Sequence, residues 1–440
     1  MKRVAFYTLG CKLNFAETSS ISRLFTEQGY QKVEPHEQPH IFVINTCSVT
    51  ANADKKCQRI VKNVLKVSPK AFIIVVGCYA QLKPEEMAAI PGVDAVLGAH
   101  EKFKLLDLLT SFEKKPHAEV HVSPIKASHT FTHAHSVGDR TRTFLKVQDG
   151  CNYHCTFCTI PLARGKSRSD TIEGIVAQAQ AIAQQGVKEI VLTGVNIGDY
   201  GIINSRRKTN FLALIQALDQ VVGIARFRIS SIEPNLLSDQ VIQFVAQSAR
   251  FVPHFHVPLQ AGSNKILKLM RRRYQRALYA DRVALVKSCM PQCCIGVDVI
   301  VGFPGETTED FLETYHFLNE LPIAYLHVFP YSERANTKAI TLAEMVPYQE
   351  RSRRAKMLRI LSEKKQRHFY EENLGQVATV LFEQEAEHGF IQGFTGNYIR
   401  VCTPYDPSLP NTLQAVQLKC INAAGLVETA ETVSAPTRSV

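Results

Sequence analysis

The first part of the chain alternates short apolar runs with amphipathic segments. Apolar runs typical of buried strands cover residues 4–9, 41–46, 72–77 and 94–98. Between them, residues 17–28, 54–67 and 102–109 carry apolar positions at helical spacing. This βαβ alternation predicts a doubly wound parallel sheet, that is, an α/β domain, over residues 1–112.

A second alternating region begins at Phe144. Its strand candidates are residues 144–147, 189–193, 227–231, 255–259, 295–301 and 325–329. Helical spacing recurs near residues 171–185, 210–221, 238–248, 263–271, 277–289 and 308–320. A closed barrel of eight such units normally needs ~250 residues, so six units in about 190 residues predict an open (β/α)6 barrel.

The pattern changes before and after this barrel. Regular periodicity fades around residues 113–140, which contain five histidines without metal-ligand spacing, so we expect a solvated linker there. Residues 351–370 form one basic helical stretch, which extends the expected barrel domain to residues 141–371. Short β runs at 377–382, 389–395 and 398–402 predict a small C-terminal β-barrel over residues 372–437.

Composition and charge narrow the class of protein. With 440 residues, 45% of them apolar, the chain can build about three cored domains. Its apolar runs fall short of the ~20 residues that span a bilayer, so we expect a cytoplasmic protein with no membrane partner. The net charge of +11 is placed unevenly, because residues 371–440 hold eight acidic and three basic side chains. The basic remainder favours a polyanion partner, with solvated surface charge as the alternative.

The cysteine spacing carries the most specific chemical signal. In a reducing cytoplasm, twelve cysteines in a large chain indicate metal or redox chemistry rather than a disulfide framework. Cys151, Cys155 and Cys158 form a C-x3-C-x2-C loop directly after the first strand of the expected barrel. Three thiolates can hold a four-iron cluster and leave one iron open, whereas structural zinc normally takes four ligands. A three-cysteine zinc site and three unrelated thiols are the alternatives.

Three further cysteines are far apart in sequence but share one position. Cys11, Cys47 and Cys78 each close a strand candidate of the first domain. Because the carboxyl ends of parallel strands open onto one crevice, these thiols are expected to converge into a second three-thiolate site. For each of these cysteines taken singly, the alternative is a thiol buried in the protein core. The other cysteines are expected to be structural: Cys57, Cys289, Cys293, Cys294, Cys402 and Cys420.

Together these motifs resemble the radical S-adenosylmethionine (SAM) methylthiotransferases over nearly the whole chain. The resemblance rests on residues 10–14 (GCKLN), Cys47, Cys78, and residues 151–165 (CNYHCTFCTIPLARG), 228–234 (RISSIEP), 256–260 (HVPLQ) and 301–307 (VGFPGET). The C-terminal region is similar to the TRAM type of RNA-binding barrel. Lys12-Leu13 and residues 161–169 (PLARGKSRS) are most similar to the branch that acts on threonylcarbamoyladenosine in tRNA.

The resemblance implies an enzyme that methylthiolates C2 of N6-threonylcarbamoyladenosine next to the anticodon. Its cofactors would be SAM and two 4Fe-4S clusters, whose ligands are Cys11, Cys47, Cys78, Cys151, Cys155 and Cys158. SAM would be held by Phe157, Gly194, Asn196, Ser231, Glu233 and Gly302, with no catalytic side chain beyond the cluster ligands. The implied partners are the tRNA anticodon stem-loop and an electron donor such as flavodoxin or ferredoxin.

The family also suggests how the two sites divide the reaction. The open iron at Cys151, Cys155 and Cys158 would bind SAM, whose reductive cleavage yields a radical that activates the adenine carbon. The second site would carry the inserted sulfur. Candidate tRNA contacts are Arg164, Lys166, Arg168, Arg271, Arg272, Arg273, Tyr274, Arg351, Arg353, Arg354, Lys356 and Arg359.

Three other functions stay open. The isopentenyladenosine branch and the branch that modifies an aspartate of a ribosomal protein share the same motifs. From a different class, the chain would be a non-catalytic iron-sulfur or zinc protein that binds RNA.

Overall fold

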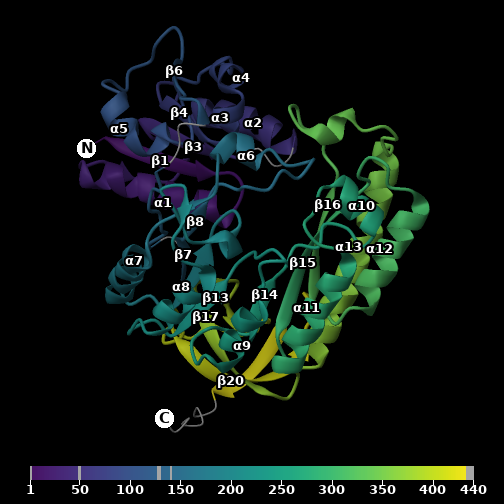
Figure 1. Ribbon diagram of the computed structural model, residues 1–440. Coiled ribbons are helices and arrows are strands. Elements are labelled where there is room, and N and C mark those ends of the chain that lie inside the picture. The colour runs from purple at the N-terminus through teal and green to yellow at the C-terminus, as the bar shows by residue number, and fades with distance from the viewer. Residues whose placement is uncertain (1, 48–50, 126–129, 139–140, 433–440) are drawn as a thin grey trace.

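The N-terminal domain is a parallel sheet with helices on both faces. The structure is a computed structural model that describes residues 2–47, 51–125, 130–138 and 141–432. The strands run in the order β2-β1-β3-β4-β5-β6 and every pairing is parallel. They are β1 (Arg3–Thr8), β2 (Gln31–Lys32), β3 (Ile41–Thr46), β4 (Phe72–Gly77), β5 (Ala95–Leu97) and β6 (Glu119–His121). The predicted doubly wound sheet is confirmed, and it forms the purple and blue part of Figure 1.

Helices connect these strands. They are α1 (Lys12–Glu27), α2 (Ala51–Val67), α3 (Cys78–Leu82), α4 (Pro84–Ala88), the 3-10 turn η1 (Glu101–Lys104) and α5 (Leu105–Leu108). Three of the connections lie where the apolar spacing indicated a helix, and the short helices α3 and α4 were not predicted. Strand β6 lies inside the predicted linker, because a three-residue strand is too short to leave a periodic signal. In the same stretch, His121 contacts Glu119 and His133 contacts Asp170, while His129 lies outside the described residues.

The middle of the chain folds into the expected open barrel. Its parallel strands form two sheets, β13-β10-β7 and β14-β15-β16, and a parallel bridge from Ser231 to His256 joins them. They are β7 (Arg142–Lys146), β10 (Glu189–Thr193), β13 (Arg226–Ile229), β14 (His254–His256), β15 (Cys294–Val301) and β16 (Tyr325–Pro330). Short pairs β8 (Gln148–Asp149) with β9 (Arg168–Ser169), and β11 (Ile202–Ile203) with β12 (Arg206–Arg207), lie in the loops.

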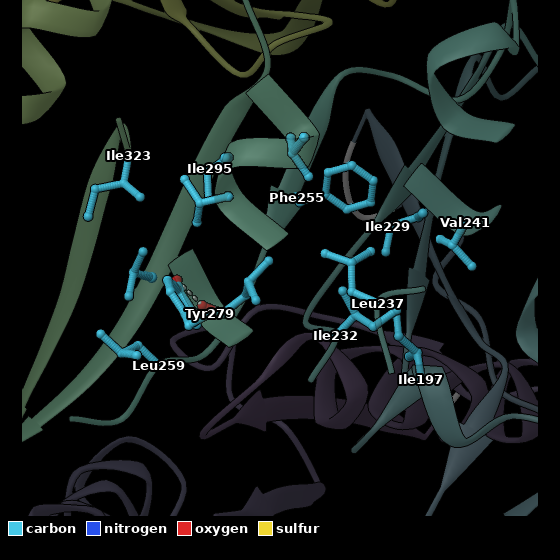
Figure 2. Close-up of a cluster of buried hydrophobic side chains, with 14 of the residues drawn as sticks. Ile197, Ile229, Ile232, Leu237, Val241, Phe255, Leu259, Tyr279, Ile295 and Ile323 are labelled. Atoms are coloured by element: carbon cyan, nitrogen blue, oxygen red, sulfur yellow. Dashed lines mark hydrogen bonds between the residues drawn. The ribbon is translucent and has the colours of Figure 1, made fainter. Parts of the chain in front are cut away.

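Helices cover the outer face of these strands. They are α7 (Ile172–Gln184), α8 (Phe211–Asp219), α9 (Asp239–Gln247), α10 (Asn264–Leu269), α11 (Arg276–Cys289) and α12 (Thr308–Glu320). The short helix α6 (Ile160–Arg164) instead packs against α3 of the N-terminal domain (Figure 1), and the 3-10 turns η3 (Ile197–Asp199) and η4 (Lys338–Thr341) lie in loops. Figure 2 shows Ile229, Phe255 and Ile295 from neighbouring strands in one apolar layer with Val241 and Tyr279 from the helices. Burial of this layer drives the sheet and helices together.

A long helix and a second barrel complete the chain. Helix α13 (Tyr348–Glu371) runs along β16, where the Ser362 hydroxyl bonds the backbone of Leu326. The closed barrel β17-β18-β19-β21-β20 follows, and it lies below the strands in Figure 1. Its strands are β17 (Val377–Glu387), β18 (Phe390–Thr395), β19 (Arg400–Pro404), β20 (Leu413–Ile421) and β21 (Val427–Thr432), so the small C-terminal barrel is confirmed. Residues 433–437 of the predicted domain lie outside the described residues.

The C-terminal barrel docks against the amino end of β13. Arg226 and Arg228 donate to the carbonyl oxygens of Phe394 (3.2 Å) and Gly396 (2.9 Å). Tyr398 stacks on His254 with ring centroids 4.5 Å apart. The barrel therefore closes the lower end of the half-barrel instead of extending freely from it. Within the described part of the chain, no helix has the length and apolar character required to cross a membrane.

A buried ion network joins the N-terminal domain to the half-barrel. The Glu17 carboxylate of α1 lies 2.5 Å from Lys102 Nζ, 3.0 Å from Lys146 Nζ and 2.8 Å from Arg164. Asp149 accepts from Arg164 at 3.1 Å. Burial would raise the pKa of Glu17, but Arg164 and the two lysines together lower it well below its usual value. Both domains therefore depend on the same charged carboxylate.

Replacing Glu17 is expected to destabilise the junction. Glu17→Ala leaves three cations buried without their shared partner, which should cost ~3–5 kcal/mol and lower the midpoint of thermal unfolding. Differential scanning fluorimetry of the metal-free protein measures the shift. Glu27→Ala, on the exposed face of the same helix, is the control. Equal midpoints for the two variants would contradict this role.

Candidate functional site

The loop after β7 brings three thiols to the carboxyl end of the half-barrel. Gln148 holds the start of this loop, because its amide nitrogen donates to the carbonyl oxygens of Asp149 (3.0 Å) and Gly150 (2.7 Å). Cys151 Sγ accepts from the backbone N–H of Tyr153 at 3.4 Å. All three thiols of the set, Cys151, Cys155 and Cys158, are free and partly accessible. The loop therefore offers three sulfurs to a ligand that lies above the barrel.

A buried arginine supports the middle thiol. Arg272 Nη1 donates to Cys155 Sγ at 2.9 Å, and its other terminal nitrogen pairs with Glu233. Burial raises the pKa of Cys151 and of Cys158 to about 12. Burial also raises the pKa of Cys155, although Arg272 lowers it in part. Such thiols stay protonated at neutral pH until a metal ion displaces the proton, because cysteine sites release protons when they bind metal.

The second set of thiols converges at the edge of the N-terminal sheet. Cys11 precedes α1, Cys47 follows β3 and Cys78 begins α3, so each lies at the carboxyl end of a strand. A Cβ built on Gly10 would lie 2.9 Å from Cys47 Sγ, which shows how tightly the first two loops approach. Burial raises the pKa of Cys11, and nearby Cys78 adds to the rise.

Arg164 connects the two sets. It ends α6, the helix that begins two residues after Cys158, and its Nε donates to Cys78 Sγ at 3.2 Å. The surrounding network places four cations, Lys102, Lys146, Arg164 and Arg168, against two carboxylates, Glu17 and Asp149. This positive excess suits an anionic group at Cys78, such as a cluster with thiolate ligands.

Among the described residues, the group that brings three potential ligand atoms within 4.8 Å of one another is His256, Asp298 and His327 rather than either thiol set. A structural zinc normally takes four ligands, whereas three thiolates can hold a four-iron cluster with one iron open. The choice of a cluster over zinc at the thiol sets stays a prediction.

Of the residues expected to hold SAM, Asn196 has the clearest geometry. Its side chain is buried, and within the described structure neither its amide oxygen nor its nitrogen has a hydrogen-bond partner. Gln148 Oε1 accepts from the backbone N–H groups of Val195 (3.0 Å) and Asn196 (2.8 Å). At Gly194 a Cβ would lie 2.8 Å from Gln148 O. Buried polar groups without partners are costly, so Asn196 is poised for a polar ligand.

The other expected SAM contacts have mixed surroundings. Ser231 bridges the two sheets, and Glu233 is already paired with Arg272. Phe157 and Cys158 line a cavity of about 220 Å³, which also contacts Asp298 and Tyr331. At Gly302 the space left by the missing side chain is filled by Arg351 of α13, since a Cβ there would lie 2.3 Å from Arg351 Cγ. The close approach at this glycine is therefore to a helix of the chain itself.

Several predicted tRNA contacts are wrong, because the side chains are buried in protein contacts. Their partners are Glu17 and Asp149 for Arg164, Asp149 for Arg168, Glu233 for Arg272, two carbonyl oxygens for Tyr274, Glu333 for Arg351 and Glu306 for Arg354. The remaining basic candidates are exposed: Lys166, Arg271, Arg273, Arg353, Lys356 and Arg359. The number of basic residues in the sequence overstated the positive charge available to tRNA at the surface, because many of these residues form ion pairs within the fold.

Sequence reasoning missed one group inside the half-barrel. Asp298 lies 2.9 Å from His256 and 3.3 Å from His327, from three neighbouring strands. Burial would raise the pKa of Asp298, but the two histidines lower it well below its usual value. Polar residues at alternate positions of otherwise apolar strands were the available signal. The structure shows that these positions face the lumen, and Asp298 reaches the same cavity as Cys158.

Comparison with known proteins is consistent with this arrangement. The radical SAM superfamily matches residues 145–318, and the uncharacterized protein family UPF0004 matches residues 3–98. A radical SAM methyltransferase, TsrM from Kitasatospora setae, shares the fold with a TM-score of 0.53 and 13% identity, covering 75% of this chain and 73% of TsrM.

Curated relatives are similar over nearly their whole length. The threonylcarbamoyladenosine tRNA methylthiotransferase MtaB of Bacillus subtilis is 40% identical, over 91% of this chain and 90% of the relative. MtaB of Aquifex aeolicus is 39% identical, over 87% and 93%. The tRNA-2-methylthio-N(6)-dimethylallyladenosine synthase of Desulfitobacterium hafniense is 30% identical, over 96% of both chains. With one three-thiol set on a radical SAM half-barrel, a second at strand ends of the N-terminal sheet, and these relatives, the chain belongs to the radical SAM methylthiotransferase family.

Proposed function

We propose that this protein transfers a methylthio group to C2 of N6-threonylcarbamoyladenosine next to the anticodon of tRNA. The observation that carries the proposal is the presence of one three-thiol set on each side of a domain junction, where Arg164, from the helix that follows the first set, contacts Cys78 of the second. The similarity to relatives named for this reaction supports the same substrate. A protein that only binds RNA would not need two such sets.

Each thiol set suits one four-iron cluster. Cys151, Cys155 and Cys158 would hold the cluster that binds SAM, and Cys11, Cys47 and Cys78 would hold the second one. When bound, the first cluster supplies an electron for the cleavage of SAM and the second supplies sulfur. The donor of that electron would be a small redox protein such as flavodoxin or ferredoxin.

The side chains around the thiols position and protect these groups. Arg272 hydrogen bonds Cys155, and Arg164 hydrogen bonds Cys78, so each set has one fixed cation on a sulfur. Hydrogen bonds to the sulfurs help to set the potential of a cluster. Phe157 contributes an apolar wall to the cavity beside Cys158, which limits the access of water. Asn196, with its free amide, would bind the polar methionyl part of SAM.

The exposed basic residues give the tRNA a place to bind. Lys166 lines the cavity beside Cys151, and Arg271 lines the one beside Cys155. Lysine and arginine at such a rim would contact phosphates and orient the anticodon loop over the half-barrel. The acidic C-terminal barrel adds few such groups. We therefore assign the main tRNA surface to the cysteine-bearing end of the half-barrel.

Nucleoside analysis tests the proposed reaction directly. In a bacterial strain without its own enzyme, expression of this chain should restore the 2-methylthio form of threonylcarbamoyladenosine in tRNA. Mass spectrometry of digested tRNA measures it, and the Cys420→Ala variant, an exposed thiol outside both sets, is the control. Appearance of 2-methylthio-isopentenyladenosine alone would contradict the substrate. Unmodified tRNA would contradict the reaction.

The two thiol sets should fail in different ways. Cys155→Ala should abolish both reductive cleavage of SAM and methylthio transfer, because it removes a ligand of the first cluster. Cys11→Ala should abolish transfer but keep cleavage. Each variant should lose about four irons per chain after anaerobic reconstitution. Loss of cleavage in Cys11→Ala, with full iron at the first set, would contradict this division.

The tRNA surface should appear in the salt dependence of binding. Replacing both Lys166 and Arg271 with glutamine should weaken tRNA binding and reduce the slope of log K against log salt by ~1 per lost phosphate contact. Fluorescence anisotropy with labelled tRNA measures the slope. Lys70→Gln, exposed just before β4 and therefore at the amino ends of the strands, away from the thiols, should leave the slope unchanged. Equal slopes for the double variant and the wild type would rule out contact there.

A further inference from the structure

A cavity at the meeting point of all three domains lies beside the second thiol set. Its volume is about 280 Å³, room for about nine waters at ~30 Å³ each. We call it the junction cavity. Its walls come from β1, α1 and the loop between them, from β7, β10 and β13, and from the C-terminal barrel: Thr8, Gly10, Cys11, Lys12, Phe15, Arg142, Phe144, Val191, Arg228 and Tyr398.

The charged side chains that line the junction cavity are all basic. Lys12, Arg142 and Arg228 line it, and its lining contains no carboxylate. Two of these cations already have partners, since Arg228 lies 2.7 Å from Glu189 and Arg142 lies 3.3 Å from Glu383. A cavity with this lining favours an anion of small size.

Lys12 is the cation that stays available. In the described parts of the chain, its ammonium group forms no ion pair and no hydrogen bond, and its side chain is exposed where it lines the cavity. Phe15, Phe144 and Val191 form apolar walls nearby. Because Lys12 is exposed at the cavity and no carboxylate lines it, a ligand that brings a carboxylate supplies the partner that the ammonium group lacks there.

We propose that Lys12 binds the carboxylate of the threonylcarbamoyl group, so that the junction cavity is the specificity pocket for this substituent. This inference rests on the proposed function and names the part of the substrate that the pocket reads. The threonylcarbamoyl group is small, polar and anionic, whereas a dimethylallyl group has no charge to offer. Its attachment atom, N6, shares the Watson–Crick edge of adenine with C2.

The position of Lys12 also suits the reaction. It directly follows Cys11, so a substituent held by its ammonium group places the same base edge next to the second thiol set. A site built to pair with a charged group rejects analogues that lack the group, because its own charge is then left unpaired. The pocket would therefore select the substrate and align C2 at once.

Binding of defined RNAs tests the inference. The probes are anticodon stem-loop RNAs that carry threonylcarbamoyladenosine, its carboxylate methyl ester, or plain adenosine, and the protein is reconstituted enzyme without SAM. For the wild type, the free acid should bind about tenfold tighter than the ester, equal to ~1.4 kcal/mol. Lys12→Gln should bind acid and ester equally and plain adenosine as the wild type does. Lys12→Arg should restore the preference for the acid.

Controls separate the possible failures. Lys104→Gln, exposed on the same domain, should keep the wild-type preference, and the iron content of Lys12→Gln should equal that of the wild type, which shows that Cys11 still functions. If the wild type modifies the threonylcarbamoyl RNA but Lys12→Gln retains the preference for the acid, the assignment of Lys12 is overturned and the proposed function stands. If the wild type modifies only another nucleoside, the proposed function itself fails.

Discussion

The structure depends on one buried set of charges at the contact between the N-terminal domain and the half-barrel. Glu17 and Asp149, from different domains, share Arg164, and each also pairs with Lys146. Burying charges is costly unless partners compensate them fully, so the two domains pack in the one arrangement that pairs all of these charges. Because Arg164 also donates to Cys78, the same geometry fixes the second thiol set relative to the loop that carries the first. The positions of both sets therefore follow from one packing arrangement.

The C-terminal barrel has a structural role that its expected RNA-binding character did not suggest. Arg226 and Arg228 hold it through carbonyl oxygens, and Tyr398 enters the lower end of the half-barrel beside His254. An acidic domain is poorly suited to bind phosphates, but its carbonyl oxygens accept from the arginines at this end of the half-barrel. Its tyrosine then becomes a wall of the cavity that contains Lys12. The domain thus shapes the substrate pocket from below, and the tRNA backbone is left to the opposite end.

Charge in this chain serves two purposes that the sequence does not separate. Arg164 and Lys166 are two residues apart, yet the first is buried among carboxylates and the second faces a cavity rim. Along α13, Arg354 pairs with the buried Glu306 while Lys356 is exposed. Helical periodicity decides which basic residue faces the protein, but the partner on the other element decides whether it is neutralised. The number of basic residues in a stretch of sequence is therefore only an upper limit on the number that can contact nucleic acid.

The sequence by itself determined the architecture and the six cysteines proposed as ligands. Apolar periodicity located most strands of the three parallel sheets, and the thiols at strand ends predicted convergence, because parallel strands end on one edge. It did not determine β2 and β6, which are too short for a pattern, or the roles of Gln148, Arg272 and Lys12. These roles arise from contacts between residues far apart in sequence, such as Arg272 on Cys155. Only the tertiary structure brings such groups together, since burial and partner choice are properties of the packed chain.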